Sequence, residues 1–309
     1  MNKQVLLSIV ILLAVIKTQA QVLYTETFDT YTLGNLGTDV TGTTAGQGGW
    51  YTTWGLNTNY QIITEPNKGK ALSMFVNNPQ QSKDLYVEKQ NLSSLINQRN
   101  SGNNVIKIEV DFYMGTLDNA ASSSSNSSAI FLYFDPPQNY TGNQTRLMYT
   151  DYHYNDNRFI VRGFDGNTMI SPTKEYKLTA NTWYTFVFYL DYTNKKCYFE
   201  IPGKNFVGNS VFLNVTNPLD FKLSKIAFFM KIDNLQGTTK REQRYDNVKI
   251  TAIQSVPAHV LSTNEVLNEQ FNVYPNPATN VVNITNSATI AVNKVVLYDV
   301  SGKLLKEET

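Results

Sequence analysis

Glu109 and Asp111 are the first residues of this sequence whose spacing suggests catalysis. They lie in the segment 106–112, where apolar and polar residues alternate, so a strand places both carboxylates on one face, opposite the apolar side chains. Two carboxyl groups about 5 Å apart perform retaining glycoside hydrolysis as nucleophile and general acid/base. The solvent-exposed face of an ordinary strand has the same alternation, so the pattern alone does not establish catalysis.

Other catalytic or transition-metal chemistry lacks the necessary residues. The histidines are His153, in an aromatic segment, and His259, in a polar one. The single cysteine, Cys197, alternates with apolar neighbours, which predicts a packed core residue rather than a nucleophile. No Gly-x-Ser-x-Gly motif occurs, and a His/Cys metal site lacks ligands. We therefore assign no catalytic residue, and enzymatic activity stays undecided.

Three carboxylates are candidates for a structural Ca²⁺ site. Asp246 shares the strand phase of Val248, and Glu26 shares that of Phe28, so both are expected to point inward. A buried carboxylate must be hydrogen-bonded, ion-paired or metal-bound, because removing its charge from water is costly. We expect Glu26, Asp29 and Asp246 to be the ligands. Hydrogen bonds or salt bridges within the protein are the alternative.

Two aromatic clusters are candidates for glycan binding, because flat rings stack on pyranose faces. The first cluster lies in a glycine-flanked segment and the second in an aromatic one; their members are Trp50, Tyr51 and Trp54, and Tyr152, His153 and Tyr154. Aromatic side chains also cap the core of a β-sandwich. For both clusters, the binding interpretation and the packing interpretation stay open.

The first twenty residues have the pattern of a signal peptide. Lys3 gives a positive start, residues 5–16 are apolar apart from Ser8, and small residues precede Gln21. This apolar stretch is shorter than the roughly 20 residues that a spanning helix needs. No later apolar run is long enough either, so we expect no integral membrane segment once the signal is removed.

Charge and composition narrow the partner classes. Of 26 basic and 25 acidic residues, Lys3 and Lys17 leave with the signal, so the mature chain is nearly neutral. It therefore offers no electrostatic reason to expect nucleic acid or an anionic membrane as partner. Aromatic residues make up 12% of the chain, and short alternating segments separated by Asn- and Gly-rich turns recur along it. These features predict an all-β, two-sheet sandwich.

The sequence divides into four parts. Residues 1–20 are the predicted signal peptide, and residues 21–253 the predicted sandwich. Residues 254–270, which contain Pro257 and little alternation, are expected to be a linker. A second, smaller β pattern follows over residues 271–309.

The C-terminal part resembles the type A sorting domain of the type IX secretion system, over roughly residues 261–309. The resemblance rests on two short motifs: Tyr274, Pro275, Asn276 and Pro277, and then Tyr298, Asp299, Gly302 and Lys303. It implies recognition by the outer-membrane translocon, followed by release from the cell or attachment to its surface. Members usually continue beyond the Gly-Lys turn, whereas this chain stops at Thr309, so we expect an incomplete Ig-like β domain.

Residues 22–252 resemble the concanavalin A-like lectin/glucanase superfamily, including laminin-G-like jelly rolls. Three segments carry the resemblance, at residues 28–50, 182–203 and 245–250. The resemblance implies a jelly-roll sandwich, a glycan partner and a Ca²⁺ near the ends of the paired first and last strands. Glucanases of this superfamily carry Glu-x-Asp-x-x-Glu on the active strand. Here Met114 occupies the third carboxylate position, which argues against catalysis.

We therefore expect a secreted or cell-surface protein with a non-catalytic, glycan-binding or adhesive sandwich, exported by the type IX translocon. One alternative is a hydrolase or lyase acting on polysaccharides; a lyase would draw on Tyr152, His153 and Arg146. A purely structural surface protein is the other alternative. The sequence identifies neither the glycan nor the oligomeric state.

Overall fold

The chain divides into two compact units, Met1–Pro257 and Ala258–Thr309, each of which is described by itself. The predicted signal peptide lies outside the described residues except for Ala20. The computed structural model of the protein describes residues 20–76, 83–115, 127–136, 145–153, 158–163, 169–170, 176–204, 206–211, 221–232, 241–261, 271–274, 281–286, 294–298 and 304–308.

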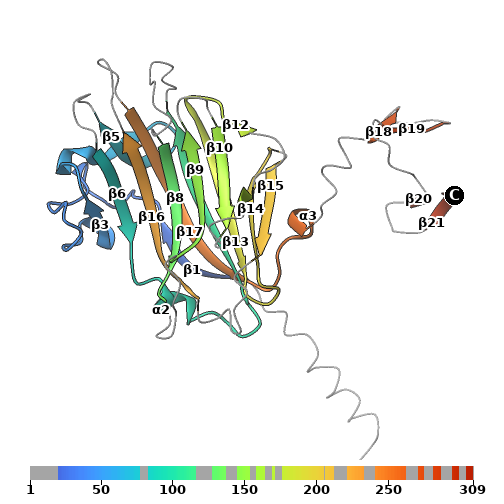
Figure 1. The fold of residues 1–309 in the computed structure, drawn as a ribbon, viewed down its shortest axis with the longest axis horizontal. Coiled ribbons are helices and arrows are strands. Elements are labelled where there is room, and N and C mark those ends of the chain that lie inside the picture. Colours follow the sequence, from blue (N-terminus) through green and yellow to red (C-terminus); the bar gives the residue numbers. More distant parts are fainter. Residues whose placement is uncertain are drawn as a thin grey trace, which may run out of the picture. The chain divides into compact units, whose positions relative to one another are not determined.

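Two antiparallel sheets, stacked face to face, form the first unit (Figure 1). Sheet A has the order β15 (Phe206–Val211), β14 (Lys196–Ile201), β13 (Thr182–Asp191), β7 (Val105–Met114), β17 (Arg241–Ile253), β5 (Gly69–Val76), β4 (Tyr60–Glu65) and β2 (Gly34–Asn35), with β1 (Gln21–Glu26) also paired to β17. Sheet B has the order β11 (Met169–Ile170), β10 (Arg158–Gly163), β9 (Arg146–His153), β8 (Ser127–Phe134), β16 (Leu223–Ile232), β6 (Lys83–Lys89) and β3 (Trp50–Thr53), with β12 (Tyr176–Lys177) paired to β10. The predicted all-β, two-sheet sandwich is confirmed.

A few helical turns accompany the strands and were not predicted. They are η1 (Gln47–Gly49), η2 (Asn57–Asn59), α2 (Ser93–Ile96) and, in the second unit, α3 (Ala258–Leu261). Each is at most four residues long, which is too short for the helical periodicity of apolar residues to be visible in the sequence.

The predicted alternation is clearest in β7. Ile106, Ile108, Val110 and Phe112 are buried, whereas the polar residues between them are partly exposed. Because side chains of a strand alternate between its faces, β7 contributes one face to the core and the other to the outer surface of sheet A. β16 behaves in the same way in sheet B, where Phe228 is buried and its neighbour Phe229 is partly exposed.

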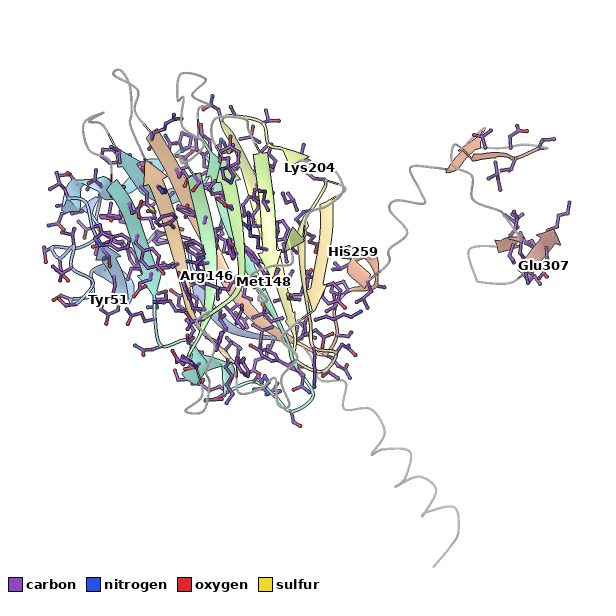
Figure 2. All side chains as sticks on the ribbon, viewed as in Figure 1. Tyr51, Arg146, Met148, Lys204, His259 and Glu307 are labelled. Atoms are coloured by element: carbon purple, nitrogen blue, oxygen red, sulfur yellow. The ribbon has the colours of Figure 1, made fainter. Side chains whose placement is uncertain are left out.

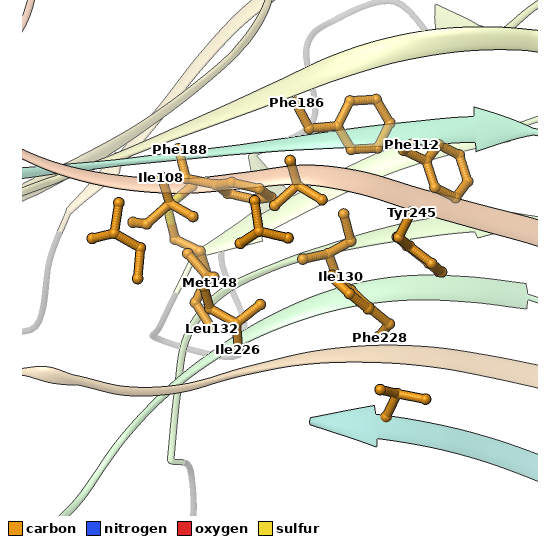
Figure 3. Packing of buried hydrophobic residues seen from close by; sticks show 14 of the residues in the cluster. Ile108, Phe112, Ile130, Leu132, Met148, Phe186, Phe188, Ile226, Phe228 and Tyr245 are labelled. Carbon is orange, nitrogen blue, oxygen red and sulfur yellow. The ribbon is translucent and has the colours of Figure 1, made fainter. Parts of the chain in front are cut away.

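Aromatic rings stack through the middle of the sandwich. Phe228 of sheet B and Tyr245 of sheet A lie nearly parallel, with ring centroids 4.0 Å apart and an interplanar angle of 6°. Trp50 stacks on Phe228 with ring centroids 5.4 Å apart, and the Phe112 ring centroid lies 5.6 Å from that of Tyr245. Figure 3 shows Tyr245 and Phe228 among the aliphatic side chains that both sheets contribute to this layer. These contacts bind the two sheets into one core.

The second unit contains two separate β-hairpins. β18 (Phe271–Tyr274) pairs with β19 (Asn283–Asn286), and β20 (Val295–Tyr298) pairs with β21 (Leu304–Glu308). Of the predicted sorting motif, Tyr274 ends β18 and Tyr298 ends β20. The remaining motif residues lie outside the described part of the chain: Pro275, Asn276, Pro277, Asp299, Gly302 and Lys303.

The stacking of Phe228 on Tyr245 predicts that Phe228 contributes much more to the free energy of unfolding than its neighbour Phe229 does. Phe228→Ala should lower the free energy of unfolding by about 3–5 kcal/mol, because it leaves a cavity between the sheets. Phe229→Ala is the matched control; it removes a partly exposed ring from the outer face and should cost only about 1–2 kcal/mol. Urea unfolding followed by tryptophan fluorescence measures both. Equal losses for the two variants would contradict this description of the core.

Candidate functional site

The outer surface of sheet B carries an unusual concentration of aromatic side chains. We call this surface the aromatic face and define it by six residues: Trp54, Tyr86, Phe131, Tyr133, Tyr149 and Phe229. Neighbouring rings touch, with centroid distances of 5.5 Å from Phe131 to both Phe229 and Tyr149. The outward positions of a sandwich strand are normally polar, so this face departs from the usual pattern.

Strand register explains why the face is hollowed. In β16, Ala227 lies opposite Phe131 of β8, and Phe229 lies opposite Ala129. Large and small residues therefore alternate both along each strand and across the pair. The two alanines are buried beneath the rings. The rings stand around a groove of about 500 Å³ that is lined by all six aromatic residues and also by polar side chains, including Arg146, Asp84 and Asp151. This volume is in the range typical of ligand sites.

A second hollow continues the groove. It measures about 320 Å³ and shares Tyr86 and Tyr133 with the first. Gln90, Asn91 and Lys225 are among its polar lining residues. The pKa of Tyr86 is raised, chiefly by burial and then by the neighbouring Tyr133 hydroxyl. The Tyr86 phenol therefore stays neutral at physiological pH and remains available as a hydrogen-bond donor and acceptor.

Cationic side chains lie over the rings of this face. The guanidinium carbon of Arg146 is 4.5 Å from the Phe131 centroid and 5.3 Å from the Tyr149 centroid. The Lys225 ammonium is 4.8 Å from the Tyr133 centroid, and it also pairs with Glu88 at 2.9 Å. Figure 2 shows Arg146 toward the middle of sheet B, whereas Tyr51 lies on β3 at its edge. Such cation–π contacts hold these long side chains close to the rings.

Trp54 reaches the groove from a constrained turn after β3. Its backbone has φ +67°, and the following Gly55 has φ +68°, a combination that a bulky residue rarely adopts. The buried Tyr60 holds the turn, because its hydroxyl lies within hydrogen-bond distance of the Thr53 carbonyl, at 2.6 Å, and of the Trp54 carbonyl, at 2.9 Å. The Trp54 ring is 52% exposed and meets the edge of Tyr86 at a centroid distance of 6.1 Å. Strained backbone of this kind is concentrated at functional sites.

The structure separates the three members of the first predicted cluster. Trp54 lines the groove, as a sugar platform requires. Trp50 is wrong as a platform residue: it lies in a strand rather than a loop, its ring has no exposed surface, and it packs between Phe28 and Phe228. Tyr51 points outward opposite Glu88 on the edge strand but does not line the groove. The alternation of β3 separates Trp50 from Tyr51.

The second predicted cluster is also divided. Tyr152 is buried in the core, so it presents no ring to a ligand, and this part of the prediction is wrong. The Nε2 atom of His153 lies 3.2 Å from an Asp151 carboxylate oxygen. Tyr154 lies outside the described residues. The ring of this strand that does reach the groove is Tyr149.

Sequence analysis missed five of the six residues of the aromatic face. The signal was present, because strand segments such as 129–134 have aromatic residues at outward as well as inward positions. Only the strand pairing shows that Phe131, Tyr149 and Phe229, which are far apart in sequence, form one surface.

Among the predicted calcium ligands, Glu26 is fully engaged by protein groups. Its carboxylate accepts hydrogen bonds from the Phe28 amide at 2.8 Å, from the Trp50 indole at 3.3 Å and from the Tyr31 hydroxyl. These donors offset the cost of burying the charge. This is the alternative that the sequence left open, and it makes Glu26 a poor metal ligand.

The second predicted ligand, Asp246, is fully buried. The Lys68 ammonium lies 4.0 Å from the Asp246 carboxylate and 2.6 Å from that of Asp111. Asp29, the third predicted ligand, accepts the Lys70 amide. In the described part of the chain, no three His, Cys, Asp or Glu side chains gather to hold a metal ion. Calcium binding at these residues stays a prediction, and Lys68 supplies the counter-charge seen here.

Glu109 and Asp111 lie on the outer face of sheet A, as their phase predicted. Asp111 accepts hydrogen bonds from Thr185 at 2.6 Å and from Asn247 at 2.8 Å, besides its ion pair with Lys68. Glu109 pairs with Lys107 at 2.7 Å. These partners account for both carboxylates as structural groups. Met114 is buried, so the third carboxylate position of the glucanase motif faces the core.

Comparison with known families identifies the C-terminal part. Residues 272–309 match the family described as "Secretion system C-terminal sorting domain", so the predicted sorting domain is confirmed over these residues. The sorting tail marks the chain for export, either into the medium or onto the cell surface. No curated protein shows significant similarity to the chain. Among the described residues, no helix has the length and apolar character needed to cross a membrane.

Solved structures with a similar arrangement of strands include sialidases and toxin binding domains. A protein described as "Sialidase" has 14% identity and a TM-score of 0.43, over 74% of this chain and 18% of that one. The binding domain of Paraclostridial Mosquitocidal Protein 1 has 12% identity and a TM-score of 0.43, over 81% and 53%. Trypanosoma rangeli sialidase has 11% identity and a TM-score of 0.38, over 77% and 33%. This chain thus spans only part of each of them.

The environment of Asp246 predicts a pH-dependent stability. Burial raises its pKa from 3.8 to about 7, with the Asn247 amide and Lys68 opposing the shift. Between these two pH values the folded state keeps a proton that the unfolded state has lost, so raising the pH lowers the free energy of unfolding. Asp246→Asn, which keeps the acceptor for Asn247, should remove this contribution and stabilise the protein at pH 8 relative to pH 4 by about 1–3 kcal/mol.

Urea unfolding of the wild type and the Asn variant at several pH values between 4 and 8 measures this effect. The difference between the two curves isolates residue 246, because the other carboxylates are common to both. The difference should grow steadily with pH. Parallel curves for the two proteins would show that Asp246 is already ionised throughout this range.

Proposed function

We propose that this chain is an exported, non-catalytic glycan-binding protein of the concanavalin A-like type, and that the aromatic face of sheet B is its binding site. One observation carries the proposal: six aromatic side chains line a groove on a surface that a sandwich normally makes polar. A contiguous aromatic surface edged by polar groups is typical of a binding site.

The groove offers both contacts that a sugar ring needs. The apolar C–H face of a pyranose packs on flat rings, and Trp54 is the most exposed ring available. Its hydroxyl groups need hydrogen-bond partners, and Asp84, Asp151 and Arg146 stand along the same groove. The second hollow extends the site past Tyr86 and Tyr133, which suits several successive units of a polysaccharide better than one terminal sugar.

The proposal places the protein outside the cell. The sorting tail supports passage through the type IX translocon, and the predicted signal peptide supports entry into the periplasm beforehand. An exported binding module meets polysaccharides of the surroundings or of the cell's own surface. The proposed partners are therefore the translocon during export and a glycan afterwards.

Glycan binding is tested by affinity electrophoresis of the chain in gels that contain a panel of polysaccharides. Trp54→Ala should weaken binding about tenfold or more, which corresponds to about 1.4 kcal/mol, because the exposed stacking ring is lost. Tyr51→Ala is the control: this tyrosine belongs to the same predicted cluster but lies outside the groove, and its loss should leave mobility unchanged.

The other functional hypotheses give different results in this assay. Reducing ends that accumulate with time would identify a hydrolase, and unsaturated sugars would identify a lyase; either result contradicts the non-catalytic proposal. Unretarded migration in every gel would contradict glycan binding and favour an adhesive role through protein contacts. Retardation that Trp54→Ala does not weaken would place the site elsewhere.

Export is tested by deleting residues 271–309 from the gene. The truncated protein should accumulate in the periplasm, because the sorting domain that the translocon recognises is gone. Immunoblots of periplasm, cell surface and medium measure the distribution. A deletion of residues 264–269 in the predicted linker is the control and should leave export intact. Normal export without residues 271–309 would contradict the assignment of the tail.

A further inference from the structure

Arg146 lies in the groove and forms no ion pair with any carboxylate in the described part of the chain. Its guanidinium contacts two ring faces, those of Phe131 and Tyr149. The acidic groups nearby have partners of their own: Asp151 is 3.2 Å from His153 and Glu88 is 2.9 Å from Lys225, while Asp84 also takes part in an interaction. The groove therefore contains carboxylates that contact other groups, beside a guanidinium whose contacts among the described residues are with aromatic rings.

A second arginine, Arg162, also lies close to the Tyr149 ring. Arg162 of β10 lies opposite Tyr149 in the strand register, and its guanidinium carbon is 5.9 Å from the same ring. Its buried Nε atom has no hydrogen-bond partner among the described residues. Two guanidinium groups thus approach one tyrosine from neighbouring strands, and the Asp151 carboxylate lines the same groove.

We propose that the groove selects an anionic glycan, one whose sugar rings carry carboxylate or sulfate groups, and that Arg146 binds the anion. This inference rests on the glycan-binding function proposed above and specifies its ligand class. A guanidinium held over aromatic rings uses its face for these contacts, and its N–H groups, which lie in the plane of the guanidinium, stay available for hydrogen bonds. These N–H groups form the fork that binds carboxylate or sulfate oxygens in a bidentate manner.

The two halves of the groove then have separate tasks. Trp54, Tyr86 and Phe229 offer ring faces on which a sugar stacks, whereas Phe131 and Tyr149 are covered by the guanidinium and serve to position it. A neutral glycan would use the first half alone. An anionic glycan uses both, and the charge-assisted hydrogen bonds to Arg146 give it the higher affinity.

Matched pairs of glycans test the inference, because the members of each pair share a sugar backbone and differ in whether their acidic groups are present as free anions. The probes are polygalacturonate with its methyl ester, alginate with its propylene glycol ester, hyaluronan with its methyl ester, and dextran sulfate with dextran. Binding of the full chain is measured by affinity electrophoresis and by calorimetry at two salt concentrations. At least one anionic member should bind ten times more tightly than its uncharged partner, with affinity falling as salt increases.

Three variants test whether Arg146 is responsible for the preference for anionic glycans. Arg146→Gln should abolish the difference within the pair, and Arg146→Lys should restore it only in part, because an ammonium lacks the planar fork. Lys196→Gln is the charge-matched control; this exposed lysine lies on β14 of sheet A, and its loss should change nothing. Unfolding curves of all variants show whether each one keeps the fold.

The outcomes separate this inference from the function on which it rests. Equal binding of charged and uncharged partners that Trp54→Ala still weakens would overturn the anionic preference and leave glycan binding intact. An anionic preference that Arg146→Gln does not reduce would overturn the role of this residue. Anionic binding that Lys196→Gln weakens as much as Arg146→Gln would indicate nonspecific attraction and also contradict the proposal. No binding to any probe would contradict both proposals.

Discussion

The face-to-face contact of Phe228 with Tyr245 is the constraint on which the rest of the sandwich depends. With ring centroids 4.0 Å apart, it joins the central strand β16 of sheet B to β17 of sheet A. Successive side chains of a strand point to opposite faces, so burying Phe228 directs Phe229 outward. The same alternation in β8 buries Ile130 and brings Phe131 to the outer face. A one-residue slip of register would exchange the core with the aromatic face, and the core contacts therefore also determine the proposed binding surface.

The outer faces of the two sheets have opposite chemistry. On sheet A, charged groups neutralise one another: Lys68 pairs with Asp111, Lys107 with Glu109, and Arg244 with both Glu65 and Glu242. Such a network leaves little for a ligand to satisfy. On sheet B the rings remain accessible, and Arg146 is balanced only by ring faces among the described residues. The proposed binding site therefore lies on sheet B, where aromatic rings rather than ion pairs make up the outer surface.

Two locally unfavourable features persist because their surroundings hold them in place. The positive φ of Trp54 is maintained by the Tyr60 hydroxyl, and replacing Gly55 by any larger residue would force a side chain against Leu85. Asp246 is buried at a cost that its raised pKa records, and Lys68 offsets part of that cost. The first feature presents a ring to the groove, whereas the second joins β17 to the loop before β5. The backbone strain at Trp54 therefore bears on the proposed binding groove. The buried carboxylate of Asp246 bears instead on the packing of sheet A.

The sequence by itself determined the β class, the strand phase of segments such as 106–112, the sorting tail and the exposed ring of Trp54, because alternation and short motifs are local properties of the chain. It did not reveal that Trp50 is buried, that Lys68 is the counter-charge near Asp246, or that Phe131, Tyr149 and Phe229 share one surface with Arg146. Those facts depend on which strands lie side by side. Strand pairing joins residues as far apart as β6 and β16, and the two-residue period of a single strand carries no information about its neighbour.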